Sequence, residues 1–299
     1  MQCETMDPAL TVTTWSGSAA GLLRKNTTVR DTATELGLYG FARIAGPLRT
    51  TQAADEVARE LVEASRLELC LPPLSIIGDF VVPPLDTGQS REFQTLHFDF
   101  GLPLDPKVEQ EVARYTALYV PIELARVQAV TRLVPLVPLL GQRSWPPPGE
   151  LVERLASYGR THGAWDDDRG YVEGSLARIV EAVAAECSPF LPSVKVKPDF
   201  LCGLEFHSLS AEVTFFERHG LRIRDVEIEV ALQPGELLVL DNLAVAHGRR
   251  GTRQPGELRQ RIFGHNLQPT AQRKLRDDFL TRFYAGQRVE VPSSTASMP

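Results

Sequence analysis

Short apolar segments broken by proline and glycine recur along the 299-residue chain, and they constrain its fold more than any other feature. Residues 115–140 are rich in Val, Leu and Pro, which suits short strands ended by turns better than one long helix. The same character predicts further strands at 38–44, 74–82, 93–100, 200–216, 223–232, 236–241 and 258–265, the last of them closing a terminal hairpin. The chain is therefore predicted to be mainly β.

Helices are predicted to flank these strands. Residues 51–67 carry apolar side chains at the spacing of a helix packed on a core, and 29–37 and 275–283 share this pattern. Each of these segments adjoins a predicted strand. The expected class is thus a β domain with helices on its outside.

One domain is expected over residues 1–290. The stretch at about 145–200 begins with three consecutive prolines, then turns polar and helical in pattern, and is interpreted as an insertion between strands. Insertions of this kind often cover active sites. Residues 291–299 are small and polar and are expected to be a disordered tail.

Composition narrows the classes of function. A net charge of −6 and a pI near 5.6 argue against a general nucleic-acid binder, which carries a concentrated basic surface. No segment approaches the roughly 20 apolar residues of a membrane span, and no signal peptide is recognised. The four cysteines are scattered without a CxxC pair. We expect a cytoplasmic protein whose partner is a small molecule, with no nucleic acid and no membrane.

Two histidine motifs predict a metal centre. His97 and Asp99 stand two residues apart in a predicted strand, so both side chains are expected on one side. His247 follows the apolar strand 237–241 and a turn, directly before a glycine. Two imidazoles and one carboxylate form the facial triad of non-haem iron, which leaves coordination positions open. Taken alone, the first motif also fits a hydrogen-bonded histidine and a solvated aspartate.

A third motif lies fourteen residues after His247. Arg259, Arg261 and Phe263 share one face of a predicted strand, and Gln260 and Ile262 share the other. An arginine on an inward face requires an anion, and a guanidinium binds a carboxylate through two parallel hydrogen bonds. The alternative is a pair of surface arginines in weak ion pairs.

Together these residues resemble the 2-oxoglutarate and Fe(II)-dependent dioxygenases, particularly the clavaminate synthase and taurine dioxygenase branch. The resemblance is carried by LHFD at 96–99, PGELLVLDNLAVAHGRRG at 234–251 and RQRIFGH at 259–265. It implies a double-stranded β-helix, a jelly roll of the cupin type, with iron at the mouth of the barrel.

The resemblance also implies the site residues and the reaction. His97, Asp99 and His247 would hold Fe(II), while Arg261, helped by Thr131, would bind the distal carboxylate of 2-oxoglutarate. With O2 as the second cosubstrate, the expected outcome is hydroxylation of an amino-acid-derived or secondary-metabolite substrate in natural product biosynthesis. Halogenation is disfavoured, because halogenating relatives replace the carboxylate that Asp99 supplies.

Three other readings stay open at this point. One is an iron oxidase that needs no cosubstrate, and another is a cupin-like isomerase or binding protein that uses its metal without redox chemistry. The third is a barrel used only for protein contacts. Production of succinate separates the dioxygenase from all of them.

Overall fold

The computed structural model describes most of the central part of the chain. The described residues are 29–45, 47–69, 71, 73–81, 93–99, 102–103, 109–124, 129–161, 165–166, 171–172, 180, 194–196, 204–206, 208–252 and 257–285. Most of the predicted insertion and all of the predicted tail lie outside these ranges.

The elements follow one another in this order. The helices are α1 (Val29–Tyr39), α2 (Thr51–Glu68), α3 (Leu136–Leu140), α4 (Pro148–Thr161), α6 (Leu209–Arg218), the 3-10 turn η2 (Ile223–Asp225) and α7 (Pro269–Ala285). The principal strands are β1 (Phe41–Ile44), β2 (Ser75–Val81), β3 (Phe93–His97), β5 (Gln110–Tyr119), β6 (Val130–Pro135), β11 (Ile228–Val230), β12 (Leu237–Asp241), β13 (Val245–Arg250) and β14 (Arg259–Leu267). Shorter strands are β4 (Leu102–Pro103), β7 (Trp165–Asp166), β8 (Tyr171–Val172), β9 (Val194–Val196) and β10 (Leu204–Phe206).

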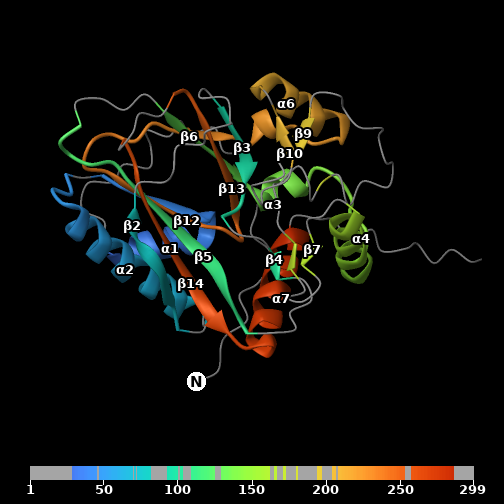
Figure 1. Cartoon of the computed structure of the whole chain (residues 1–299), viewed down its shortest axis with the longest axis horizontal. Coiled ribbons are helices and arrows are strands. Elements are labelled where there is room, and N and C mark those ends of the chain that lie inside the picture. The colour runs from blue at the N-terminus through green and yellow to red at the C-terminus, as the bar shows by residue number, and fades with distance from the viewer. Residues whose placement is uncertain are drawn as a thin grey trace, which may run out of the picture.

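Two antiparallel sheets form the body of the molecule (Figure 1). The five-stranded sheet has the order β1-β12-β5-β14-β2, and the four-stranded sheet has the order β11-β6-β13-β3. Along the chain the strands β2, β3, β5 and β6 alternate between the two sheets, and so do β11, β12, β13 and β14. This alternation is the winding of a double-stranded β-helix, so the predicted fold is confirmed.

The inner core lies between the two sheets. Leu118, Leu238 and Leu240 enter it from the five-stranded sheet, and Leu133 and Val245 enter it from the four-stranded sheet. All five side chains are buried. Because side chains alternate along a strand, the residues between them face outward. This parity decides which residues can reach the inside of the barrel.

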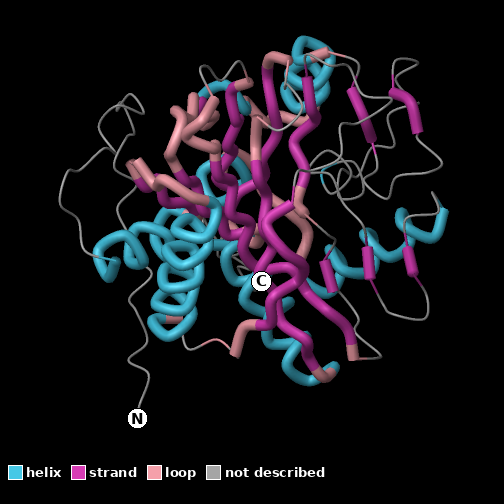
Figure 2. Tube along the Cα trace, turned by 60° about the vertical axis from the view of Figure 1, so that its left-hand side comes forward, coloured by secondary structure: helices cyan, strands magenta, loops and turns pink. Residues whose placement is uncertain are grey.

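Helices cover the outer face of each sheet, as the tube in Figure 2 shows. Helices α1 and α2 pack on the five-stranded sheet, where α2 begins at Thr50, whose hydroxyl accepts a hydrogen bond from Ala53 N at 3.0 Å. Helix α6 packs on the four-stranded sheet beside β3 and β10. Both inner faces are thereby left for the core and the site.

Several local predictions are confirmed. Helix α2 matches the expected 51–67, and the turn before β12 forms, with Glu236 N bound to Gln233 O at 3.0 Å. Gly235 in this turn has φ +85°, which explains why a glycine follows the proline. Within the described residues, no helix has both the length and the apolar character needed to cross a membrane.

Other local predictions are wrong. Residues 209–218 form helix α6 instead of continuing a strand, because Ser208 caps them by accepting a hydrogen bond from Ala211 N at 3.2 Å. Residues 136–140 form the short helix α3. The terminal hairpin does not form either, since β13 and β14 belong to different sheets.

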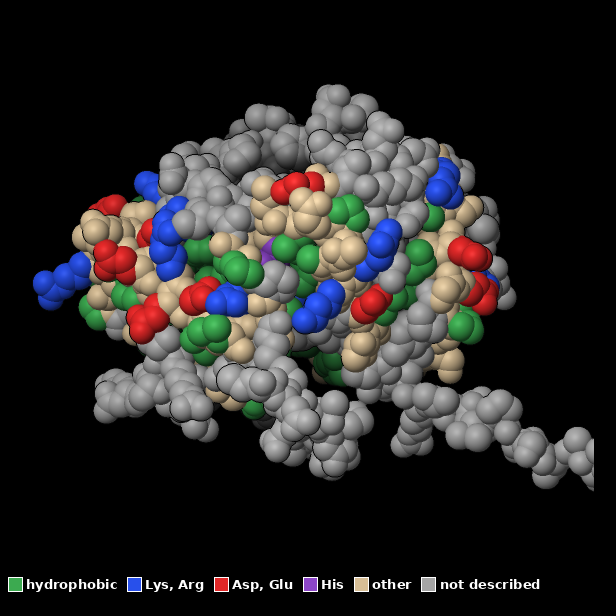
Figure 3. Space-filling model, turned by 90° about the horizontal axis from the view of Figure 1, so that it is seen from below, with side chains coloured by type: hydrophobic (Ala, Val, Ile, Leu, Met, Phe, Trp, Pro, Cys, Tyr) green, Lys and Arg blue, Asp and Glu red, His purple; other side chains and the backbone are tan. Residues whose placement is uncertain are grey.

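Charged side chains are mixed on the described part of the surface seen in Figure 3. Acidic and basic groups alternate across this face, with hydrophobic side chains between them. Ion pairs between exposed side chains also occur, such as that of Arg250 with Glu229, 2.7 Å apart. A concentrated basic patch is not seen among the described residues of this face.

Candidate metal centre

The two predicted histidine ligands stand opposite each other on neighbouring strands. His97 is the last residue of β3, and its partner in the antiparallel ladder is His247 of β13. Their ring centroids are 4.4 Å apart. Motifs 150 residues apart in the chain are thus joined by one strand pairing, as expected for residues directly opposite in a sheet.

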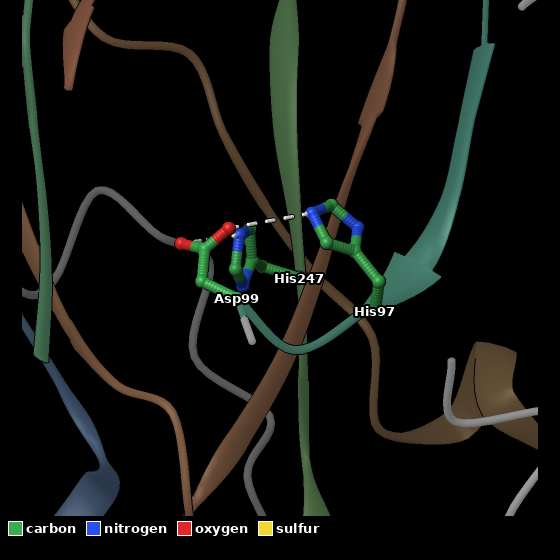
Figure 4. A group of neighbouring side chains, drawn as sticks. All are labelled: His97, Asp99 and His247. Atoms are coloured by element: carbon green, nitrogen blue, oxygen red, sulfur yellow. Dashed lines mark ion pairs between the residues drawn. The ribbon is translucent and has the colours of Figure 1, made fainter. Parts of the chain in front are cut away.

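Asp99 completes the group from just beyond the strand. The prediction placed it on the same strand as His97, but β3 ends at His97 and Asp99 lies in the bend that follows. Its Oδ1 is 3.8 Å from His97 Nε2, and its Oδ2 is 3.5 Å from His247 Nε2. Figure 4 shows the three side chains pointing toward one another.

This spacing fits one metal ion. One ligand atom from each residue lies within 4.8 Å of the others. An ion bonded at about 2.1 Å to two atoms separates them by up to about 4 Å. The two distances from the Asp99 carboxylate to the histidines, 3.8 and 3.5 Å, lie within this limit. The residues that the structure brings together are therefore of the right type and close enough to hold a single first-row ion.

The hydrogen bonds of His97 prepare one nitrogen for a metal. Its Nδ1 lies 2.9 Å from the carbonyl oxygen of Thr95, which makes this nitrogen the N–H donor. The other nitrogen, Nε2, then carries the lone pair and faces Asp99. The ring is held in the tautomer that a metal ligand requires.

His247 is held neutral by its surroundings. Burial lowers its pKa to about 4, and the nearby Asp99 carboxylate only partly opposes this effect. Its Nδ1 is buried without a hydrogen-bond partner among the described residues. The other nitrogen, Nε2, faces Asp99, and a buried neutral imidazole suits a metal ligand because a metal binds the unprotonated form.

Gly248 allows the two histidine strands to approach closely. A Cβ at this position would lie 2.7 Å from the backbone oxygen of Gln94 on β3. Any larger residue would push the strands apart beside the His97–His247 pair. The glycine after the histidine in the sequence motif therefore has a packing reason.

Arg261 is not brought to this group. It pairs with Ala117 on β5, and with Phe263 it faces the helices that cover the five-stranded sheet. There its Nη1 makes a short ion pair with Asp55 of α2. An anion on the outer face, Asp55, thus already meets this guanidinium, and the predicted contact of Arg261 with 2-oxoglutarate stays a prediction.

The inward face of β14 carries an amide instead. Gln260 lies on the opposite side of the strand from Arg261, and its Nε2 donates to Asp99 Oδ2 at 3.0 Å. The sequence showed that Gln260 and Arg261 face opposite ways, but it did not show which of them faces inward.

Thr131 lies on the inner face of the four-stranded sheet. It is two residues from the core residue Leu133 on β6, and its ladder partner on β13 is Arg249. Since Arg249 is two residues after His247, strand parity places it on the same face as that histidine. Arg249 Nη1 also donates to the carbonyl oxygen of Gly251. The sequence analysis did not consider Arg249, although its spacing of two residues from His247 was visible.

Comparisons with known proteins give limited similarity. No protein-family model matches the chain, and no curated protein matches it either. Among solved structures, a taurine dioxygenase from Burkholderia xenovorans is 11% identical, covers 81% of this chain and 83% of its own, and has a TM-score of 0.35. PvcB from Pseudomonas aeruginosa is 12% identical over 84% of this chain and 83% of its own, with a TM-score of 0.40. AAD-2 in complex with Mn(II) and N-oxalylglycine is 11% identical, with a TM-score of 0.41. The match covers 82% of this chain and 93% of AAD-2.

Proposed function

We propose that this protein is an Fe(II)- and 2-oxoglutarate-dependent dioxygenase that hydroxylates a C–H bond of a small amino-acid-derived or secondary-metabolite substrate. The observation that carries the proposal is the convergence of His97, Asp99 and His247 between the sheets of a double-stranded β-helix. Two imidazoles and one carboxylate with open positions are the ligand set of non-haem iron oxygenases.

The cofactors and the chain have separate tasks. Iron and 2-oxoglutarate supply the oxidising power, because loss of CO2 from 2-oxoglutarate to give succinate provides two electrons for the reduction of O2. One oxygen atom enters succinate and the other enters the substrate as a hydroxyl group. The chain binds the ion through His97, Asp99 and His247, and it orients the reactants and limits access of water.

Thr131 and Arg249 are the residues that we assign to the distal carboxylate of 2-oxoglutarate. They stand opposite each other on β6 and β13, on the face that also carries His247. A guanidinium with a neighbouring hydroxyl offers charge-assisted hydrogen bonds to a carboxylate. This assignment replaces Arg261, whose guanidinium lies on the outer face with Asp55.

The test is anaerobic loading of the full chain with Fe(II) and 2-oxoglutarate, followed by exposure to O2 with a panel of amino-acid-derived metabolites. We expect succinate to form, and we expect one substrate to gain the mass of one oxygen atom. Oxidation of a metabolite without use of 2-oxoglutarate would instead indicate an iron oxidase without cosubstrate. Binding of metal without any oxidation would indicate an isomerase or binding protein.

A further inference from the structure

The carboxylate of Asp99 is asymmetric in its contacts. Its Oδ2 accepts two hydrogen bonds, one from the Thr116 hydroxyl and one from Gln260 Nε2 at 3.0 Å. No hydrogen bond from the described residues reaches Oδ1, which lies 3.8 Å from His97 Nε2. Each oxygen lies near one histidine, since Oδ2 is 3.5 Å from His247 Nε2, but only Oδ2 accepts hydrogen bonds from the described residues.

The two donors come from adjacent strands and share one face. Thr116 on β5 and Gln260 on β14 are diagonal neighbours, since Gln260 is paired with Leu118 and Thr116 with Ile262. Both side chains therefore enter the barrel from neighbouring positions on its inner face. Thr116 is fully buried, so water does not compete for its hydroxyl.

A third residue sets the direction of the threonine hydroxyl. Asn242 Nδ2 lies 3.3 Å from Thr116 Oγ1 and 3.4 Å from the backbone oxygen of Asp99. The backbone oxygen can only accept, so the asparagine must present its N–H groups on this side. The hydroxyl oxygen of Thr116 then accepts from Asn242, and its hydrogen is directed to Asp99 Oδ2. Gln260 also presents its N–H2 group, because an ionised carboxylate only accepts.

From these contacts we infer that Thr116 and Gln260 are positioning residues that restrict Asp99 to binding the metal through Oδ1 alone, with Asn242 orienting Thr116. The inference rests on the proposed metal site. Binding through one oxygen uses one coordination position where binding through both would use two. The network therefore preserves an open position for the reactants.

The test uses the full chain and Mn(II), followed by electron paramagnetic resonance and difference infrared spectroscopy. The variants are Thr116→Val and Gln260→Met, alone and together, since each removes a donor with little change in size. Thr116→Ser restores the hydroxyl. Ile262→Val is the matched control, because it shortens the cross-strand neighbour of Thr116 on β14 and leaves both donors of Asp99 in place.

We expect the double variant to bind Mn(II) about ten- to a hundredfold more weakly, as is typical when the partners of a metal ligand are removed. In the Mn(II)-bound double variant, the frequency separation between the antisymmetric and symmetric carboxylate stretches should be smaller than in the Mn(II)-bound wild type. A smaller separation signals a shift to coordination through both oxygens. Thr116→Ser and Ile262→Val should retain the affinity and the spectrum of the wild type. A mere loss of packing would lower the melting temperature without changing the infrared separation.

Two results would overturn the inference, and they are distinguishable. If the folded double variant kept both the affinity and the carboxylate spectrum of the wild type, the positioning role would be wrong while the metal site stood. If the wild type bound no Mn(II) and no Fe(II), the proposed function would fail together with the inference.

Discussion

At the scale of single residues, the site depends on His97, Asp99 and His247 and on what holds each of them. The carbonyl of Thr95 fixes the tautomer of His97, burial keeps His247 neutral, and two donors orient Asp99. That these three side chains form one group could be predicted from the sequence, because each stands in a short recognisable motif. The residues that hold Asp99 could not, because Thr116 and Gln260 meet it only once the strands are paired.

Gly248→Ala should separate the two histidines. The added Cβ would lie 2.7 Å from Gln94 O, so β3 and β13 must move apart beside the site. We expect metal affinity to fall at least tenfold and the protein to lose about 1–3 kcal/mol of stability, the usual cost of overpacking. Titration with Mn(II) and urea unfolding measure the two effects. Gly149→Ala is the control, since a Cβ there has no atom within 4 Å, and unchanged affinity in Gly248→Ala would contradict the packing role.

Arg249→Gln should weaken 2-oxoglutarate binding about ten- to a hundredfold, because it removes charge-assisted hydrogen bonds worth roughly 1.5–3 kcal/mol. Calorimetric titration of the Mn(II)-loaded protein with 2-oxoglutarate measures this change. Arg261→Gln is the comparison, and its affinity for 2-oxoglutarate should stay near that of the wild type. If Arg261→Gln lost binding and Arg249→Gln kept it, our assignment of the carboxylate site would be reversed.

At the scale of secondary-structure elements, buried ion pairs join helices to sheets. Arg261 and Asp55 join β14 to α2, and Arg132 on β6 contacts Glu212 of α6 on the outside of the other sheet. Burial disfavours the charge of Arg132, but Glu212 and Glu227 outweigh this effect and raise its pKa. The alternation of residues 259–263 was readable from the sequence. The sequence did not show which face of this strand meets the core, because the answer depends on where the covering helix packs.

The Arg261–Asp55 pair should be important for stability. Arg261→Gln leaves Asp55 partly buried without its partner, and breaking a buried pair typically costs 3–5 kcal/mol; we expect about 3 kcal/mol, because Asp55 keeps some exposure. Urea unfolding of Arg261→Gln, Asp55→Asn and the double variant gives the coupling energy. Arg250→Gln, which breaks an exposed pair with Glu229, is the control and should change stability by less than about 1 kcal/mol. Additive effects of the two buried changes would show that the pair is not coupled.

At the scale of the whole molecule, two sheets share a core and the site opens between them. The mainly β class was predictable, because short apolar strands and turns recur along the chain. The double-stranded β-helix, which the structure forms, was implied by the resemblance of the histidine and arginine motifs to a known family. Helix α6 was not predicted from the sequence, because Phe206, Phe215 and Phe216 gave the segment strand character. The hydrogen bond at Ser208 decided the outcome, and such a cap competes with apolar propensity over a short segment.

The metal-free protein should lose stability as the pH falls below 6.5. The unfolded chain binds a proton at His247 below about pH 6.5, while the folded chain does so only near pH 4, so protonation favours unfolding. His265 acts in the same direction, because burial lowers its pKa as well. We expect His247 alone to remove about 2 kcal/mol between pH 7 and pH 5. Urea unfolding at pH 7 and pH 5 measures this loss of stability. The His247→Gln variant should lose less stability than the wild type between the two pH values. An equal decline in that variant would contradict the neutral, buried state of His247.

The most direct test of the central claim is the number of Fe(II) ions bound per chain under anaerobic conditions, for the wild type and for His247→Ala. The structure predicts one tightly bound ion per wild-type chain and none in the variant at the same free iron concentration. Equal iron binding by the two proteins, with both folded, would show that His97, Asp99 and His247 are not the metal centre.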